Sequence, residues 1–123
     1  MDIVLSPASD KPIYVQIAEQ IAAQILKGDL AGGTTLPPIR TVARQLAVSV
    51  ITVKKAWEEL ARAGFIDTVV GRGTFVSCHP PGGLGSKREA IALERLEKDL
   101  AFYRELGLTA AELIELVRQV YGE

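Results

Sequence analysis

Two apolar patterns in residues 36–76 limit the fold of this chain more than any other feature. In residues 39–46 apolar side chains recur at i, i+3, i+4 and i+7, the spacing of one buried face of a short helix. A second pattern of this kind follows after a short gap and runs to Ala63, where Gly64 is placed to end a helix. The spacing therefore predicts two helices joined by a tight turn.

A cap and a hairpin complete this segment. Ser49 stands where its hydroxyl can cap the first turn of the second helix. Two runs rich in β-branched residues, 65–70 and 74–77, follow on either side of a Gly-Arg-Gly turn whose glycines can take positive φ. The order of elements predicts a mainly α fold with a small β-hairpin, a winged helix-turn-helix with its helices at about 38–63 and its wing at about 65–77.

A helix-turn-helix presents its second helix to the major groove of DNA, where hydroxyl and cationic side chains of the first two turns reach bases and phosphates. In this chain those residues are Ser49, Thr52, Lys54 and Lys55. The alternative is a core-forming helix pair with an ordinary solvated face. The hairpin that follows the second helix favours DNA binding.

The same residues resemble the GntR family of bacterial transcription regulators. The family pattern has a Leu-Pro-Ser-x-Arg start, then Leu-Gly-Val-Ser-Arg-x-Thr-Val, a basic pair, an aromatic residue and a Gly-x-Gly-Thr-Phe-Val wing. The matching residues are Leu36, Pro37, Arg40, Leu46, Val48, Ser49, Thr52, Val53, Lys54, Lys55, Trp57, Leu60, Gly64, Gly71, Gly73, Thr74, Phe75 and Val76. The resemblance implies a sequence-specific DNA-binding transcription regulator.

The resemblance and the helix positions together predict the DNA-binding residues. They are Arg40, Thr41, Arg44, Ser49, Val50, Thr52, Lys54, Lys55, Gly71, Arg72 and Gly73. The cations expected mainly to hold phosphate are Arg44, Lys54, Lys55 and Arg72. The residues expected to reach bases or a groove are Arg40, Ser49 and Thr52.

Three positions depart from the family pattern. Pro38 stands where a serine would cap the first helix, so the preset φ of proline must take the place of that cap. Ala47 replaces the turn glycine, at a cost of about 1 kcal/mol if its backbone is left-handed. Val50 replaces an arginine that reads a base in much of the family, and it offers an apolar contact, for example to a thymine methyl. We therefore expect an operator unlike the common family consensus.

The net charge of −1 argues at first against a nucleic-acid partner, but the distribution of charge reverses that argument. Residues 36–77 contain six Lys and Arg against three Asp and Glu, whereas residues 78–123 contain six against eight. The cations thus lie on the elements that would dock on DNA. The small excess predicts modest, salt-sensitive affinity for one copy, which makes dimerisation useful.

The residues before this segment predict a supporting helix. Ser9 or Asp10 can cap it, Pro12 fits its early turn, and isoleucines recur about every four residues up to Gly28, which is placed to end it. Residues 28–35 are expected to form a loop that carries the chain to the helix-turn-helix.

Residues 79–85, which include a Pro-Pro-Gly-Gly run, are expected to be a hinge between a DNA-binding domain, residues 1–78, and a helical tail, residues 86–123. The chain has one cysteine and one histidine, Cys78 and His79, too few to complete a metal site within one copy. A metal site shared between two copies and a thiol that oxidises stay open alternatives. With no catalytic set evident, we expect no cofactor, no metal and no enzymatic activity.

The tail carries two helix patterns. Ser86 with Glu89, and Thr109 with Glu112, are each spaced as a capping box, and Gly107 is placed between the two helices. We expect an apolar stripe on these helices to form a dimer interface. Its residues are Leu93, Leu96, Leu100, Tyr103, Leu106, Leu113, Leu116, Val117 and Val120. An intramolecular helical hairpin is the alternative.

The tail also resembles that of the YtrA-like subfamily, through a Leu-Gly-Leu-Thr-x-x-Glu-Leu match that begins at Leu106. This resemblance implies a dimerising tail. We therefore expect a cytoplasmic, homodimeric bacterial regulator, a repressor acting on a short inverted repeat of double-stranded DNA, with no membrane segment. A winged-helix module for protein or RNA, and a non-specific DNA binder, are the alternatives. A small-molecule effector of unknown identity stays an open alternative as a further partner.

Overall fold

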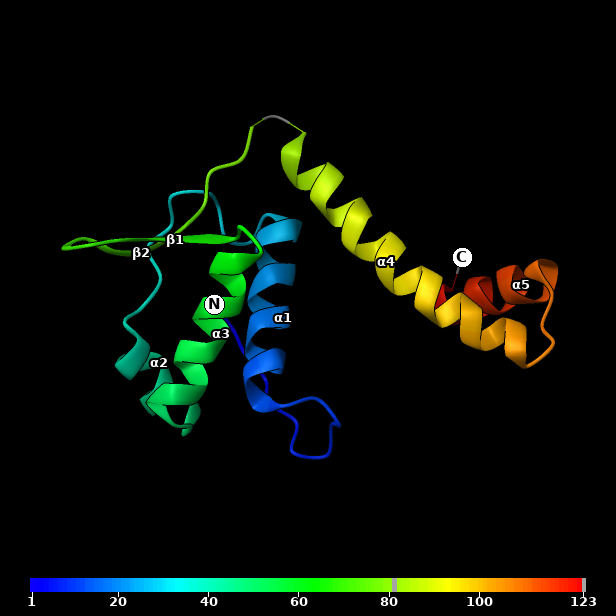
Figure 1. The fold of residues 1–123 in the computed structure, drawn as a ribbon, viewed down its shortest axis with the longest axis horizontal. Coiled ribbons are helices and arrows are strands. Elements are labelled where there is room, and N and C mark those ends of the chain that lie inside the picture. The colour runs from blue at the N-terminus through cyan, green and yellow to red at the C-terminus, as the bar shows by residue number, and fades with distance from the viewer. Residues whose placement is uncertain (81, 123) are drawn as a thin grey trace. The chain divides into compact units, whose positions relative to one another are not determined.

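The computed structural model of the protein describes residues 1–80 and 82–122. In chain order its elements are α1 (Ile13–Lys27), α2 (Ile39–Leu46), α3 (Val50–Arg62), β1 (Ile66–Val69), β2 (Gly73–Val76), α4 (Gly83–Glu105) and α5 (Ala110–Tyr121) (Figure 1). The chain forms two compact units, Met1–Leu84 and Gly85–Glu123. Helices with one antiparallel hairpin confirm the predicted winged helix-turn-helix class.

The core of the first unit lies where α1 and α2 pack against α3 (Figure 1). Each helix contributes the apolar positions that recur at helical spacing, and the hairpin closes one end through Ile66 and Val76. The buried core residues are Ile17, Ile21, Ile25, Leu36, Val42, Ala43, Val53, Ala56, Trp57, Leu60, Phe65, Ile66 and Val76. Burial of these side chains is the main favourable contribution to folding, because it removes apolar surface from water.

Helix α3 has the ends that its sequence predicts. The Ser49 hydroxyl accepts a hydrogen bond from the backbone N–H of Thr52, as an N-cap does. At the other end Gly64 has φ +80°, and the N–H groups of Gly64 and Phe65 donate to the carbonyls of Ala61 and Leu60. These two hydrogen bonds satisfy backbone carbonyls that a helix end would otherwise leave unpaired. Both predicted ends of α3 are therefore confirmed.

The tight turn between α2 and α3 contains a strained alanine. Ala47 ends α2 with φ 55° and ψ 43°, the one non-glycine residue in residues 1–80 and 82–122 whose φ is positive. Its N–H donates back to the carbonyls of Ala43 and Arg44, which anchors this conformation. An L-alanine pays a steric cost there because its Cβ approaches the following carbonyl.

Replacing Ala47 with glycine should raise the free energy of unfolding by about 1 kcal/mol, because glycine takes a left-handed conformation without that cost. Chemical denaturation followed by circular dichroism measures the change. Ala23→Gly is the matched control: Ala23 is exposed inside α1, so the same exchange should lower stability by about 0.5–1 kcal/mol. A loss of stability in both variants would contradict the prediction.

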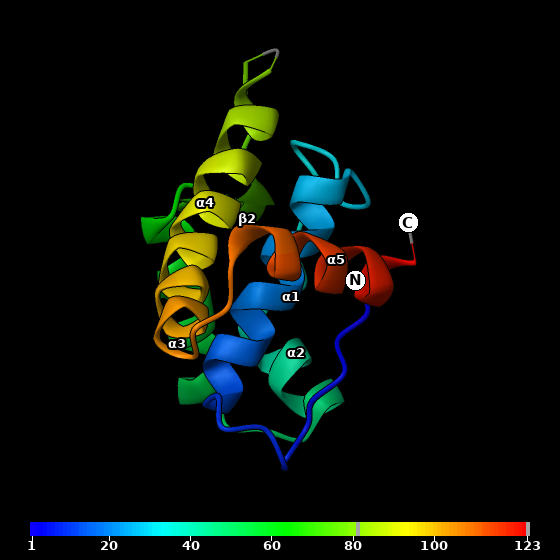
Figure 2. The ribbon, with the colours of Figure 1, turned by 90° about the vertical axis from the view of Figure 1, so that its right-hand side faces the viewer.

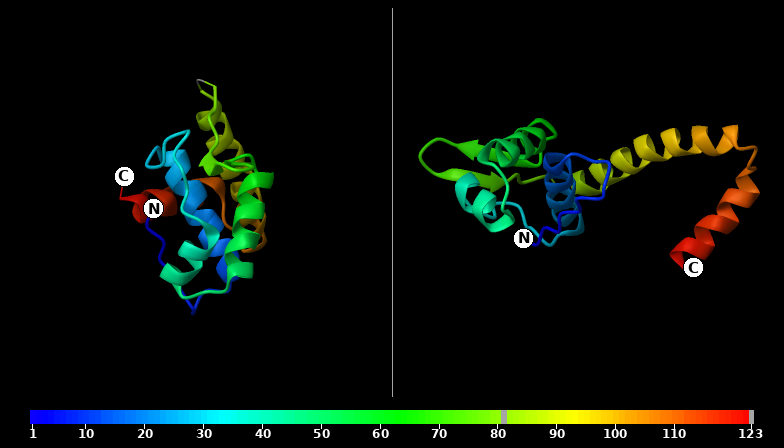
Figure 3. Two further views of the ribbon diagram at one scale, coloured as in Figure 1. Left: turned by 90° about the vertical axis from the view of Figure 1, so that its left-hand side faces the viewer. Right: turned by 90° about the horizontal axis from the view of Figure 1, so that it is seen from below.

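The wing is a two-stranded antiparallel sheet in which Ile66 pairs with Val76 and Val69 with Gly73. Gly71 and Gly73 have φ of 81° and 107°, which confirms the predicted turn chemistry. The hairpin extends away from the helices of its unit (Figure 3, right). The predicted loop at residues 28–35 does more than connect, because residues 33–36 pair with β2 through a bridge from Thr35 to Phe75. This pairing ties the base of the wing to the start of α2.

The predicted cap of α1 by Ser9 or Asp10 is wrong. The helix begins at Ile13 after Pro12 and has no side-chain cap, and the Ser9 hydroxyl instead accepts from the N–H of Lys11. Proline lacks an N–H and has a φ suited to this junction, so less capping is needed. The predicted terminator is confirmed, since Gly28 follows the helix with φ 88°.

Three glutamines of α1 hold the N-terminal segment in an extended conformation. Gln16 bonds the backbone of Ser6 and the carbonyl of Lys11, Gln20 bonds both backbone groups of Val4, and Gln24 bonds the carbonyl of Asp2. Four helical residues rise about 6 Å, and two extended residues about 6.6 Å, so the two spacings match. The segment thus runs antiparallel to α1 (Figure 2), with Ile3 and Leu5 packed on the core.

The second unit, Gly85–Glu123, is the tail unit, and it contains α4 from Gly85 onward together with α5. Helix α4 begins at Gly83, inside the predicted hinge, so Ser86 lies within the helix and its predicted capping role is wrong. Leu84 explains the earlier start, because its side chain packs against the core of the first unit. Pro81, also in the predicted hinge, lies outside the described residues. Gly107, with φ 82°, follows the end of α4 as predicted.

The second predicted capping box is confirmed at the start of α5. The Thr109 hydroxyl accepts from the N–H of Glu112, and the Glu112 carboxylate accepts from the N–H of Thr109, at 3.2 and 3.1 Å. The hydrogen bond from the Thr109 backbone N–H to the carboxylate, and after it the interaction with the Thr109 side chain, hold the pKa of the Glu112 carboxyl below its usual value. Within residues 1–80 and 82–122 no helix is long and apolar enough to cross a membrane.

Candidate nucleic-acid interface

The predicted DNA-binding residues lie on α2, on the first turns of α3 and on the wing, and none of them is buried. Thr41 and Thr52 are half-buried, and the others are exposed. The buried residues of the same helices are apolar and hold the exposed side chains on a rigid frame. The first unit therefore presents most of the predicted residues to solvent on α2, α3 and the wing.

The two hydroxyls predicted to reach DNA from α3 bond each other. Ser49 Oγ and Thr52 Oγ1 lie 2.8 Å apart, and Ser49 Oγ also accepts the N–H of Thr52 at 3.1 Å. One hydroxyl proton is used in this pair, whichever oxygen donates it. The two residues together thus keep one hydroxyl proton for another partner, and their first role is to cap the helix.

Arg40 and Arg72 line one groove although 32 positions separate them in the sequence. The groove has a volume of about 410 Å³, and Trp57 and the residues at the start of α2 complete its wall. Arg40 comes from the first turn of α2 and Arg72 from the tip of the wing. Both residues are exposed arginines, and an arginine side chain presents several donors in a fixed plane that suit phosphate or a base edge.

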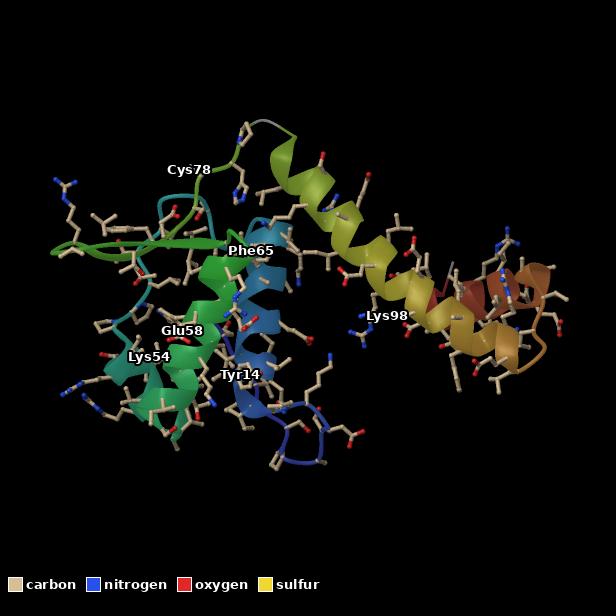
Figure 4. The ribbon with its side chains drawn as sticks, viewed as in Figure 1. Tyr14, Lys54, Glu58, Phe65, Cys78 and Lys98 are labelled. Carbon is tan, nitrogen blue, oxygen red and sulfur yellow. The ribbon has the colours of Figure 1, made fainter. Side chains whose placement is uncertain are left out.

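The two adjacent lysines of α3 have different surroundings. The ammonium of Lys55 lies 5.8 Å from the centroid of the Tyr14 ring on α1, a cation–π contact. Lys54 is exposed on the same helix, and among the described residues no cation–π contact with Tyr14 is found for it; Figure 4 labels Lys54 on α3 and Tyr14 on α1. We infer that Lys54 is free to meet DNA phosphate, whereas Lys55 must share its position between Tyr14 and phosphate.

An exposed residue that the sequence analysis did not select is Ile51. It lies in the first turn of α3 with 67% of its surface exposed, next to Val50 at 44%. An apolar side chain at helical spacing is easily assigned to the core. Its offset from the buried series Val53, Ala56 and Leu60 identifies it as outward-facing.

Cys78 and His79 follow the wing. The Cys78 thiol is free and exposed, and a Cβ added to Gly32 would lie 3.2 Å from its sulfur. In the described part of the chain, no group of three His, Cys, Asp or Glu side chains is placed to hold a metal ion. These residues therefore add no donor set to the surface formed by α2, α3 and the wing.

The predicted dimer-interface residues form an apolar surface on the tail unit. All are exposed except Leu113, which is half-buried, and the right panel of Figure 3 shows the turn between α4 and α5. Two hollows of about 360 and 520 Å³ lie on this surface, and Leu113 and Val117 line both. Exposure of so many large apolar side chains together on one unit is typical of a protein interface.

Comparison with protein families gives one match that covers the helix-turn-helix and wing. Residues 13–76 match the family described as bacterial regulatory proteins, gntR family. The chain is 34% identical to the uncharacterised HTH-type transcriptional regulator YhcF of Bacillus subtilis, over 89% of this chain and 90% of that protein. It is 32% identical to the HTH-type transcriptional repressor YtrA of B. subtilis, over 98% of this chain and 93% of that protein.

Solved structures agree with these relatives. A transcriptional antiterminator from Listeria monocytogenes matches with a TM-score of 0.80 and 31% identity, over all of this chain and 91% of the other. The DNA-binding domain of AraR in complex with operator ORX1 matches with a TM-score of 0.54 and 31% identity, over 61% of this chain and 93% of the other. The surface formed by α2, α3 and the wing thus belongs to a type of domain that has been seen on operator DNA.

Proposed function

This chain belongs to the gntR family of bacterial regulatory proteins and is a DNA-binding transcription regulator, and from this premise we propose that it is a homodimeric repressor of a short inverted-repeat operator. The supporting observation is the groove in which Arg40 of α2 and Arg72 of the wing lie together. With six Lys and Arg against three Asp and Glu in residues 36–77, the helix-turn-helix and wing carry a net positive charge that favours the DNA backbone. We place this activity in the bacterial cytoplasm, where such DNA lies.

We assign the predicted residues to two kinds of contact. Arg40, with the exposed first turn of α3, reads bases in the major groove. Arg72 approaches the minor groove, because the glycines on either side of it let the backbone come close to the DNA. The remaining cations hold phosphate and set the orientation of the domain: Arg44, Lys54 and Lys55. Thr41, which is half-buried on α2, is also assigned to the DNA-binding surface.

The apolar tail surface supports a dimer of this chain. A two-fold dimer places two recognition helices about one turn of DNA apart, and each half-site then adds to the affinity of the other. The tail bears more exposed apolar surface than two isolated helices can hide from water, so a second copy of the same surface is the partner we propose.

The test is binding of the purified protein to duplex DNA from upstream of its own gene, against shuffled DNA and duplex RNA of equal length, across a salt series. Preference for the native fragment supports the proposal. Equal and steeply salt-dependent binding to both DNAs would reduce the protein to a non-specific DNA binder, and preference for RNA would replace the proposal with an RNA-binding module.

Replacing Lys54 or Lys55 with alanine should weaken binding to operator and shuffled DNA about equally, because phosphate contacts carry no sequence information. Each lost contact should reduce the slope of log affinity against log salt by about 0.9, and the effect should be smaller for Lys55, which already contacts Tyr14. Lys98→Ala, an exposed lysine on α4 (Figure 4), is the matched control and should leave the slope unchanged. A loss confined to the operator would contradict the assignment.

A further inference from the structure

The first turn of α3 exposes two branched apolar side chains where a DNA-reading helix meets the bases. Val50 is 44% exposed and Ile51 67% exposed, and both follow directly after the Ser49 cap. Neither belongs to the core, since the buried residues of α3 begin at Val53. Burial in the core therefore does not account for the branched apolar side chains at these two positions.

Polar reading by the same turn is restricted. The hydroxyls of Ser49 and Thr52 bond each other at 2.8 Å, so one hydroxyl proton is left between them. Thr52 is also half-buried, and Lys54, the first cation of α3, lies beyond this turn. The largest groups that this turn can bring to a base edge are thus aliphatic.

We propose that Val50 and Ile51 recognise the C5-methyl groups of thymine in the major groove, so that methyl contacts specify the base pairs beneath the first turn of α3. The thymine methyl is the apolar group on the major-groove edge of a base pair; its presence distinguishes A·T from G·C pairs, and its position in the groove distinguishes T·A from A·T. This inference rests on the proposed function and adds to it the chemical basis of its specificity.

The charges around the two side chains favour DNA over an apolar protein partner. Arg44 on α2 and Lys54 on α3 are both exposed and lie on the same helix-turn-helix, and no ion pair is recorded for either in the described part of the chain. Lys54 follows Val50 by four residues and Ile51 by three in α3, so a cation shares the face of these two aliphatic side chains. That combination suits a polyanion that carries apolar groups, and methyl-bearing duplex DNA has that chemistry.

The first experiment selects high-affinity duplexes from a random pool with the full-length protein and then replaces single thymines by deoxyuridine, which removes the methyl and keeps every hydrogen-bonding group. Each half-site should contain at least one T·A pair whose change to U·A weakens binding about fourfold, the value expected for one buried methyl. The same change in both half-sites should weaken binding about fifteenfold.

Two variants assign the effect to residues. For each of Val50→Ala and Ile51→Ala, we expect one thymine position at which the thymine and deoxyuridine duplexes bind with equal affinity. The side chain that contacts the methyl at that position is absent from the variant. Val70→Ala is the matched control, since Val70 is 98% exposed on the wing and should leave the deoxyuridine effect intact. Val50→Arg should select guanine in place of thymine, because arginine pairs with the O6 and N7 of guanine.

The outcomes separate this inference from the proposed function. Sequence-specific binding with no loss at any deoxyuridine would overturn methyl recognition and leave the operator-binding function in place. Selection of no sequence from the pool would overturn both. A deoxyuridine effect that persists in both alanine variants would show that other residues contact the methyl groups, and would also overturn the assignment.

Discussion

Replacing Arg40 with alanine should lower the affinity for operator DNA by about 5- to 150-fold per half-site, the range that one lost arginine–base contact of about 1–3 kcal/mol produces. Affinity for shuffled DNA should fall only a fewfold, because Arg40 then contributes little beyond its charge. The ratio of the two affinities is therefore the quantity to measure, at one salt concentration and by direct titration.

The position of Arg40 explains why the effect should be large. Arg40 is exposed at the start of α2 and lines the groove that Arg72 also lines from the wing, which is the surface that we propose docks on the duplex. Arg40→Lys keeps the charge but loses the planar fork of donors, and it should not restore discrimination. Arg62→Ala is the matched control, because Arg62 lies in the last turn of α3 and pairs with Glu59.

Two outcomes would contradict this role for Arg40. If Arg40→Ala and Lys55→Ala lost affinity for operator and shuffled DNA by the same factors, the division between base-reading and phosphate-holding residues would be wrong. If Arg40→Lys retained the full ratio of affinities, charge alone would account for the contribution of Arg40.

Replacing Val117 with glutamate should convert the dimer to a monomer and lower operator affinity by about 10²–10⁴-fold, the contribution expected when a second binding domain is tethered to the first. Val117 lines both hollows of the tail surface, so a carboxylate there would have to be buried unpaired in the interface. Sedimentation and operator titration measure the two effects.

The side chain of Val117 is exposed within the tail unit, so the helices should form without it, and circular dichroism checks this. Gln119→Glu is the matched control, because it adds the same charge at an exposed position of α5 that lines neither hollow. Removal of the tail after Ser77 should also give a monomer with weak DNA binding, and ending the chain after Gly85 keeps Leu84 on the core. A dimer that survives these changes would refute the role of the tail.

Local features of the sequence determined the helices and their ends. The caps at Ser49, Gly64 and Thr109 each satisfy backbone groups within about four residues, so residue type and spacing were enough to predict them. Apolar spacing identified the buried faces of α1, α2 and α3 for the same reason. The Ser86 cap failed because the packing of Leu84, a tertiary contact, decided where α4 begins.

The groupings of residues that give this protein its surface were decided by the tertiary structure. Three groupings join residues that are distant in the sequence. Thr35 pairs with Phe75, Gln16 and Gln20 bond the N-terminal segment, and Arg40 and Arg72 line one groove. Spacing along the chain predicts the face on which a side chain lies within its own element. Which faces meet depends on how the elements pack to remove apolar surface from water, and that energy belongs to the whole unit.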